Sequence, residues 1–285
     1  MTLINKSVDK KSKITIGFSP CPNDTYIFNA MINGLIPDQG IEYNCIMEDV
    51  EVLNKLSMKE ELDVVKISYF AFSKISDKYQ LLTAGGALGS NCGPILVSNN
   101  ANKIPNTESR IAIPGYNTTA NLLLSLAYPE CTNKEAVLFS DIERGVIEGR
   151  YDFGLIIHES RFTYESKGLH KIVDLGEYWE EYKNVPIPLG AIAIKRSLPE
   201  ELKLKINNSI RNSILFANDH LDQTMEFVKL HAQEMEEEVM KAHISLYVNE
   251  YSLDVGIKGK EAVGCLFEEI AIRDHATFHK PIFIS

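Results

Sequence analysis

The sequence lacks the features that would place it in several common classes of protein. Among 285 residues it has one tryptophan, and it has no run of about 18 apolar residues that would suit a transmembrane helix. Its net charge is −10, and an acidic surface disfavours nucleic acids and anionic membranes. We therefore expect neither nucleic acid nor membrane as a partner, and the sequence predicts no oligomeric state.

Cysteine is sparse, and neither its number nor its spacing suits disulfide bonds or a structural zinc site. The five cysteines are odd in number and contain no C-x-x-C pair, so neither a disulfide framework nor a structural zinc site is expected. The opening "MTLINKSVDKKSK" has no apolar core of a signal peptide. We interpret that segment as a disordered lead-in. The prediction is a cytoplasmic protein with reduced cysteines and no metal.

What the chain does contain is a regular alternation of strand and helix patterns. "KITIGFS" alternates as a strand does, and "TYIFNAMINGLI" then places its apolar residues on one helical face. "IEYNCIMED" and "VEVLNKLSMKEE" repeat the pair, and the pattern becomes mostly helical after residue 195. This order predicts the α/β class.

Two β runs, near residues 93–99 and 185–195, bracket a middle block with its own strands and helix. A chain that leaves one lobe, builds a second and returns would have this pattern, with a ligand in a central cleft. We expect a first lobe from residues 1–96, a second from 97–190, and a return with C-terminal helices over 191–285. A single doubly wound sheet would give a similar pattern and stays open as the alternative.

The segment "SPCPNDT" concentrates prolines and small polar residues, which interrupt regular secondary structure. It lies between the first strand pattern and the first helix pattern. A loop that enters a helix presents free backbone N–H groups and the positive end of the helix dipole, which favour an anion. Ser19, Asn23 and Thr25 add side-chain donors. Simple helix capping is the competing interpretation, and it is the commoner role for such residues.

A second loop, "PGYNTTANLLL", repeats the arrangement in the middle block with Asn117, Thr118 and Thr119 before an apolar helix. Two such loops, one in each lobe, suit a cleft that closes on an anionic small molecule. Neither loop is followed by a Walker-type lysine or spells G-x-G-x-x-G, so nucleotide phosphate is not the expected ligand.

Two further candidates follow β runs. Lys66 and Ser68 end the run "VVKIS", where ligand sites of α/β proteins lie, although Lys66 would equally suit a solvated strand end. His158 ends "FGLII", and histidine is the natural general base near neutral pH. The alternative for His158 is a buried core histidine. Glu159 would point the opposite way if the strand continued, and is a poor candidate for orienting the ring.

Four segments together, "SPCPNDTYIF", "KISYFAF", "PGYNTTANLLLSL" and "FGLIIHESRFTY", closely resemble the 1,4-dihydroxy-6-naphthoate synthase family of the futalosine route to menaquinone. The resemblance runs from about Ile14 to the C-terminal helices. It implies a two-lobed, periplasmic-binding-protein-like (type II) α/β fold used as a lyase. The implied substrate is cyclic dehypoxanthinyl futalosine, which yields the naphthoate and dihydroxyacetone without metal or organic cofactor.

The resemblance also implies roles for individual residues. His158 matches the general base, and the substrate contacts match Lys66, Ile67, Ser68, Thr118 and Thr119. The opening loop, with Ser19, Asn23 and Thr25, would place donors at the floor of the cleft. Two alternatives remain: the sister chorismate dehydratase, which the opening signature disfavours, and a cytoplasmic solute-binding or sensor protein, which needs no general base.

Overall fold

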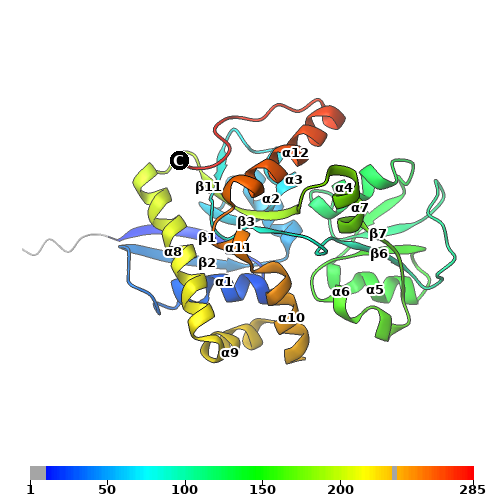
Figure 1. Cartoon of the computed structure of the whole chain (residues 1–285), viewed down its shortest axis with the longest axis horizontal. Helices are drawn as coiled ribbons and strands as arrows, with labels where there is room; N and C mark the ends of the chain where they lie inside the picture. The colour runs from blue at the N-terminus through cyan, green and yellow to red at the C-terminus, as the bar shows by residue number, and fades with distance from the viewer. Residues whose placement is uncertain (1–10, 233–235) are drawn as a thin grey trace, which may run out of the picture.

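The computed structural model describes residues 11–232 and 236–285, which form two β-sheets with helices packed around them (Figure 1). The first sheet has the order β2-β1-β3-β11-β4, with β5 paired to β11. Its strands are β1 (Ser12–Phe18), β2 (Ile41–Met47), β3 (Val64–Ser68), β4 (Tyr79–Leu81), β5 (Ala87–Gly89) and β11 (Ile187–Lys195). The second has the order β10-β6-β9-β7-β8. Its strands are β6 (Ile95–Ser98), β7 (Ile111–Ile113), β8 (Lys134–Ala136), β9 (Phe153–Ile156) and β10 (His170–Asp174).

The two sheets show that the expected α/β class is correct and that the alternative of a single doubly wound sheet is wrong. The chain changes from the first sheet to the second between Gly89 and Ile95, and it returns between Asp174 and Ile187. The lobe boundaries at residues 96 and 190 stay a prediction. The expected lead-in falls mostly on residues 1–10, outside the described residues.

The order of the first sheet brings two loops to one edge. β1, β2 and β3 are parallel, with Gly17 opposite Val65, whereas β11 runs antiparallel to β3 with Ile192 opposite Lys66. All five residues of β3 are buried, including Lys66 and Ser68, because the strand lies inside the sheet between β1 and β11. Because parallel strands end at the same edge, the residues after Phe18 and the end of β3 lie side by side.

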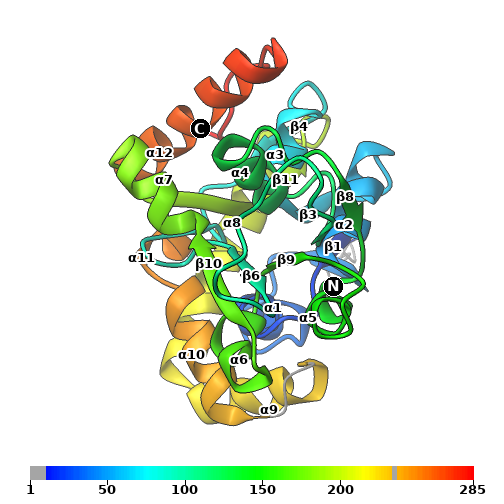
Figure 2. The same cartoon turned by 90° about the vertical axis from the view of Figure 1, so that its right-hand side faces the viewer.

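The helices fall into two groups. α4 (Thr119–Ala127), α5 (Phe139–Ile147), α6 (Ser160–Thr163), the 3-10 turn Glu165–Lys167 and α7 (Leu175–Lys183) belong to the middle of the chain and surround the second sheet (Figure 2). The first sheet is accompanied by α1 (Pro22–Ile32), α2 (Val50–Met58), α3 (Tyr69–Ser73), α8 (Glu200–Asp219), α9 (Leu221–His231), α10 (Glu237–Tyr247), α11 (Glu250–Leu253) and α12 (Gly256–Asp274). No described helix is long and apolar enough to cross a membrane.

Two features join the halves of the molecule. One apolar cluster includes buried residues of both sheets, among them Val65 of β3 and Leu155 of β9. Helix α1 packs on α8, α9 and α10, and α10 reaches the second half, where the rings of His243 and Phe162 lie 6.4 Å apart. The ends of both sheets therefore meet around a common space.

Candidate active site

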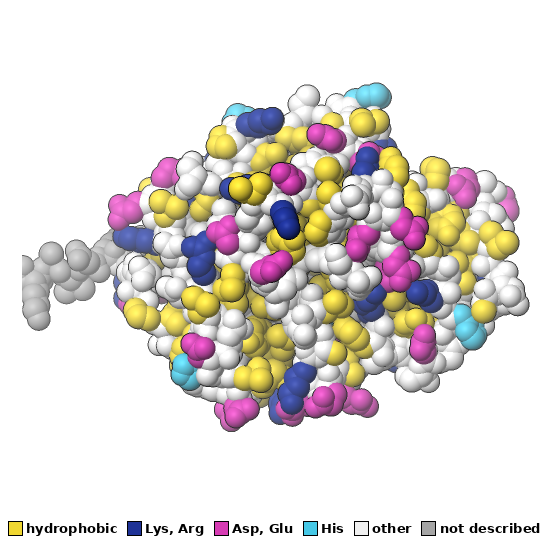
Figure 3. Space-filling model, in the orientation of Figure 1, with side chains coloured by type: hydrophobic (Ala, Val, Ile, Leu, Met, Phe, Trp, Pro, Cys, Tyr) yellow, Lys and Arg dark blue, Asp and Glu magenta, His cyan; other side chains and the backbone are white. Residues whose placement is uncertain are grey.

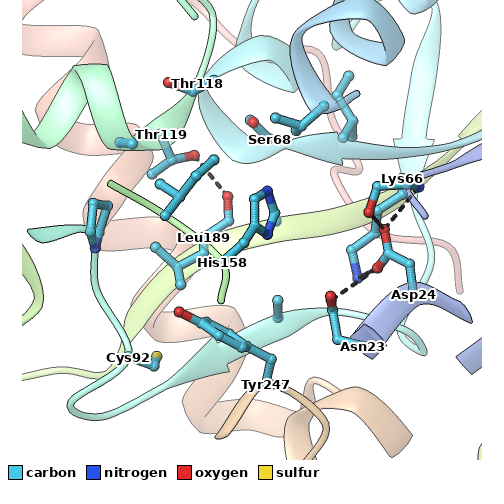
Figure 4. A pocket seen from close by; sticks show the side chains of 18 of the residues that line it. Asn23, Asp24, Lys66, Ser68, Cys92, Thr118, Thr119, His158, Leu189 and Tyr247 are labelled. Carbon is cyan, nitrogen blue, oxygen red and sulfur yellow. Dashed lines mark hydrogen bonds and ion pairs between the residues drawn. The ribbon is translucent and has the colours of Figure 1, made fainter. Parts of the chain in front are cut away.

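A pocket lies where the two sheets meet, and it encloses about 740 Å³ of empty volume, including space open to solvent (Figure 4). Most of the residues predicted from the sequence line it, namely Ser19, Asn23, Lys66, Ile67, Ser68, Thr118, Thr119 and His158. Residues far apart in sequence thus converge on one pocket.

The wall at the start of α1 is organised around a buried carboxylate. Asp24 accepts hydrogen bonds from the backbone nitrogen and Oγ of Ser19 at 3.1 and 2.7 Å, and from Nδ2 of Asn23 at 3.0 Å. Lys66 Nζ lies 3.1 Å from Asp24 Oδ1 and also donates to the carbonyl of Gly85 at 2.8 Å. The donors of Ser19, Asn23 and Lys66 are therefore directed at Asp24, a residue that the sequence analysis did not single out.

The capping assignment at α1 differs from the expectation. Cys21 is the N-cap and its side chain makes no capping bond, while Pro22 occupies the first turn. Thr25 is fully buried and does not line the pocket, because its hydroxyl donates to the carbonyls of Cys21 and Pro22 at 3.1 and 3.3 Å. The geometry therefore gives no support to Thr25 as a substrate contact.

The loop before α4 is held by ordinary capping. Thr118 is the N-cap, and its Oγ1 accepts from the nitrogen of Asn121 at 3.2 Å and donates to the carbonyl of Gly115 at 2.8 Å. Asn117 donates to the buried carboxylate of Glu51 on α2, from its backbone nitrogen at 3.2 Å and its Nδ2 at 2.8 Å. The loop of the second sheet is thereby fastened to a helix of the first.

Thr119 fastens the same loop at a second point. Its Oγ1 donates to the carbonyl of Leu189 on β11 at 2.8 Å and accepts from the nitrogen of Phe70 at 3.3 Å. Both threonine hydroxyls already have partners in this structure. A substrate that bonded to either hydroxyl would have to share or replace one of these interactions.

His158 follows the end of β9 by two residues, as its position after an apolar run predicted. Its φ of 57° turns the chain into the left-handed region, so the strand does not continue through Glu159, and the condition under which Glu159 would point the opposite way is not met. Nε2 of His158 is buried and has no hydrogen-bond partner among the described residues. The ring of Phe139 packs against the ring of His158 in an edge-to-face arrangement, with centroids 4.9 Å apart.

The surroundings of His158 keep its ring neutral. Burial is the largest cause that lowers its pKa, to about 4; the nearby Asp24 raises it and Lys66 lowers it further. At neutral pH the imidazole therefore carries a free lone pair, which is the form a general base requires.

Helix α10 contributes two pocket residues that the sequence analysis missed, His243 and Tyr247. Only 1% of His243 is exposed, so its side chain faces the interior although many residues of its segment are charged. Met240, His243, Ile244 and Tyr247 are all buried and recur at helical spacing. That periodicity was a readable signal that His243 faces inwards. Burial lowers the pKa of His243 well below its usual value.

One group of metal-ligating side chains occurs among the described residues. One ligand atom each from Cys21, His158 and Glu159 lies within 4.8 Å of the others. Burial raises the pKa of the Cys21 thiol well above its usual value, so the thiol stays protonated, whereas metals bind the thiolate. This chemistry does not favour a metal, and the absence of a metal stays a prediction.

Comparison with known proteins places the chain among enzymes. A 1,4-dihydroxy-6-naphtoate synthase of Thermus thermophilus is 41% identical over 95% of this chain and 99% of its own length. One of Streptomyces coelicolor is 38% identical over 90% of this chain and 93% of its own.

Solved structures agree with the fold. A protein of Archaeoglobus fulgidus superposes with a TM-score of 0.86 at 33% identity, covering 92% of this chain and 98% of that one. A Candida albicans protein described as having the generic periplasmic binding protein fold gives 0.63 at 13% identity, covering 96% and 97%. The second likeness confirms the expected fold alone. The family model for menaquinone biosynthesis matches residues 14–271, and the chain belongs to this family.

Proposed function

We propose that the protein is a carbon–carbon lyase that converts cyclic dehypoxanthinyl futalosine to 1,4-dihydroxy-6-naphthoate and dihydroxyacetone in menaquinone biosynthesis. Family membership and the names of both curated relatives support this activity. The observation that carries the mechanism is the neutral His158, whose buried Nε2 has no partner among the described residues and borders the pocket.

The reaction needs little besides a base and a shielded pocket. Removal of a proton leads to cleavage of a carbon–carbon bond, and formation of the aromatic ring supplies driving force. The cleavage is redox-neutral, so the proton taken by Nε2 of His158 can return to the three-carbon fragment as it leaves. We assign His158 this role of general base, and Ser68, Thr118 and Thr119 the contacts to the substrate.

Substrate binding is also expected to tune the base. A pKa of about 4 makes a weak base at neutral pH, and efficiency is highest when the pKa lies near the working pH. The naphthoate product is a carboxylate, and a substrate carboxylate in the same pocket would favour the protonated imidazole. Binding would then raise the pKa of His158 towards neutrality during turnover.

The deciding experiment is a turnover assay with purified protein and cyclic dehypoxanthinyl futalosine, with both products quantified by mass spectrometry. We expect naphthoate and dihydroxyacetone in equal amounts, and an unchanged rate after dialysis against a chelator. Binding without turnover would favour a solute-binding protein, and conversion of chorismate instead would favour the dehydratase.

We further propose that the protein acts in the cytoplasm without nucleic-acid or membrane partners. Its cysteines are free, as a reducing compartment requires. On the face shown in Figure 3, lysine and arginine are scattered among aspartate and glutamate and form no basic patch. Cells lysed at low salt without detergent would test this proposal, and we expect the native protein in the cleared lysate.

A further inference from the structure

Two histidines face each other across the pocket, and only one of them has a role in the proposed reaction. The rings of His158 and His243 are nearly parallel, with an interplanar angle of 9° and centroids 6.1 Å apart. His158 comes from the second sheet, whereas His243 comes from α10 in the C-terminal helices. A polar ring that is 1% exposed in a mostly apolar helix face requires a reason, because leucine would fill the space without a desolvation cost.

The reason begins with a chain of hydrogen bonds along one wall. Lys66 Nζ lies 3.1 Å from Asp24 Oδ1, which accepts from Asn23 Nδ2 at 3.0 Å. The other end of the Asn23 amide, Oδ1, lies 3.0 Å from Nε2 of His243. The contact joins residues 220 positions apart in sequence. Figure 4 shows Lys66, Asp24 and Asn23 together on one side of His158.

Each group in the chain fixes the next. A carboxylate only accepts hydrogen bonds, so Asn23 must present its NH₂ group to Asp24 and its carbonyl oxygen to His243. That oxygen also only accepts, so Nε2 of His243 must carry a hydrogen. In the neutral ring Nδ1 then has the lone pair; it is buried, with no hydrogen-bond partner among the described residues, 3.8 Å from Glu159 Oε2.

We propose that His243 is a positioning residue for this reaction, whose Nε2–H holds the Asn23 amide and thereby fixes the Asp24 carboxylate beside Lys66, on one side of the base His158. The inference rests on the proposed function and deepens it. Asp24 and Lys66 are the two charges that act in opposite directions on His158. Their relative positions therefore set the field at the base, and α10 holds that arrangement from the opposite end of the chain.

The first test compares two substitutions that differ in one donor. His243→Gln can place an amide N–H near the position of Nε2, whereas His243→Phe keeps a ring and removes the donor. We expect kcat to fall about 10²-fold in His243→Phe, the loss typical of a small misplacement at a reacting centre. His243→Gln should stay within a few-fold of wild type, and KM should change little in either variant.

A control on the same helix separates positioning from packing. Ile244 is buried beside His243 but does not line the pocket. Ile244→Val should lower Tm and leave kcat unchanged. If both His243 variants merely lower Tm and the folded protein turns over normally, the positioning role is overturned. If His243→Gln is as inactive as His243→Phe, the ring itself transfers protons and the proposal is again overturned.

A double-variant cycle tests whether His243 acts through Asn23. If it does, His243→Phe combined with Asn23→Ala should be no slower than the slower single variant, because both remove the same interaction. Losses that multiply would show independent roles and overturn the proposal.

A measurement that needs no turnover separates this inference from the proposed function. In ¹⁵N NMR of the wild-type protein at neutral pH, Nε2 of His243 should carry the hydrogen, and Asn23→Ala should release this preference. A ring protonated at Nδ1 would overturn the chain. Absence of naphthoate formation by wild type, with the Nε2–H tautomer present, would refute the proposed reaction while supporting the chain that orients Asn23 and Asp24.

Discussion

The two loops that enter α1 and α4 have similar sequences but different hydrogen bonding. At α1 the donors of Ser19, Asn23 and Lys66 all point at Asp24, so a carboxylate of the protein already occupies that position. At α4, Thr118 caps the helix, and no acidic residue lies in its first turn. At α4 the nearby carboxylate is that of Glu51 on α2, which accepts from the backbone nitrogen and Nδ2 of Asn117 just before the cap. The α1 loop thus provides a carboxylate that is paired with a cation, whereas the carboxylate beside the α4 loop is held by amide donors.

The largest effect should come from substitution of His158, which lines the same pocket as both loops. His158→Asn removes the proposed base but suits the fold, because asparagine tolerates the left-handed backbone at φ 57°. Loss of general-base catalysis should lower turnover about 10²–10⁴-fold, with substrate affinity retained. Steady-state assays and calorimetry on one preparation would measure both.

The control for His158→Asn is His220→Asn, an exposed histidine at the end of α8 that should leave turnover unchanged. A well-folded His158→Asn protein with normal turnover would end the general-base assignment.

The second prediction breaks the ion pair at α1. Lys66→Met leaves Asp24 buried without its cation, and side chains of both residues are at most 8% exposed. Removing one partner of a buried pair typically lowers the free energy of unfolding by about 3–5 kcal/mol. Urea unfolding would measure this loss, and the matched Lys66→Met, Asp24→Asn double variant should recover part of it. A loss below about 1 kcal/mol would contradict a structural role for the pair.

The third prediction concerns the α4 loop. Replacing Thr118 and Thr119 together by valine should weaken substrate binding by about 1.5–3 kcal/mol, the usual loss for a hydrogen bond to a charged group. Loss of the Thr118 cap should also lower the free energy of unfolding by about 1 kcal/mol. Calorimetry in a His158→Asn background would prevent turnover during the titration. The double serine variant keeps both hydroxyls and is the control; an unchanged Kd for the valine pair would refute the contact.

The smallest effect is a pH dependence of stability. The pKa of His158 is about 4 in the folded protein against 6.5 as a free side chain. Below pH 6.5 the unfolded chain therefore binds a proton that the folded protein does not, and stability falls until about pH 4. The slope for one proton is at most about 1.36 kcal/mol per pH unit. Wild type should lose more stability than His158→Asn between pH 7 and pH 5, and parallel curves would refute the depressed pKa.

Local patterns predicted the alternation of strands and helices, because each element depends on neighbouring positions in the chain. Of the base and substrate contacts expected from the sequence, all but Thr25 line the pocket. Asp24 was not predicted as the acceptor at the start of α1, because "PNDT" contains three residues that can cap a helix. Only the position of the neighbouring strand end shows that Asp24 is the one that meets Lys66. For the same reason Thr25 was expected to contact the substrate, although it does not line the pocket. His243 had a burial signal in its helical spacing, but its partner Asn23 lies on α1, and no local pattern joins the two.

The position of α10 also has a consequence for synthesis of the protein. At about 5–20 residues per second, roughly ten to forty seconds separate translation of Asn23 from that of His243, 220 residues later. For most of that interval α1 has no α8, α9 or α10 to cover it, although its Ile27 and Phe28 are fully buried in the finished protein. The nascent chain therefore exposes an apolar helix until its last third emerges, and ribosome-associated chaperones are expected to bind it there.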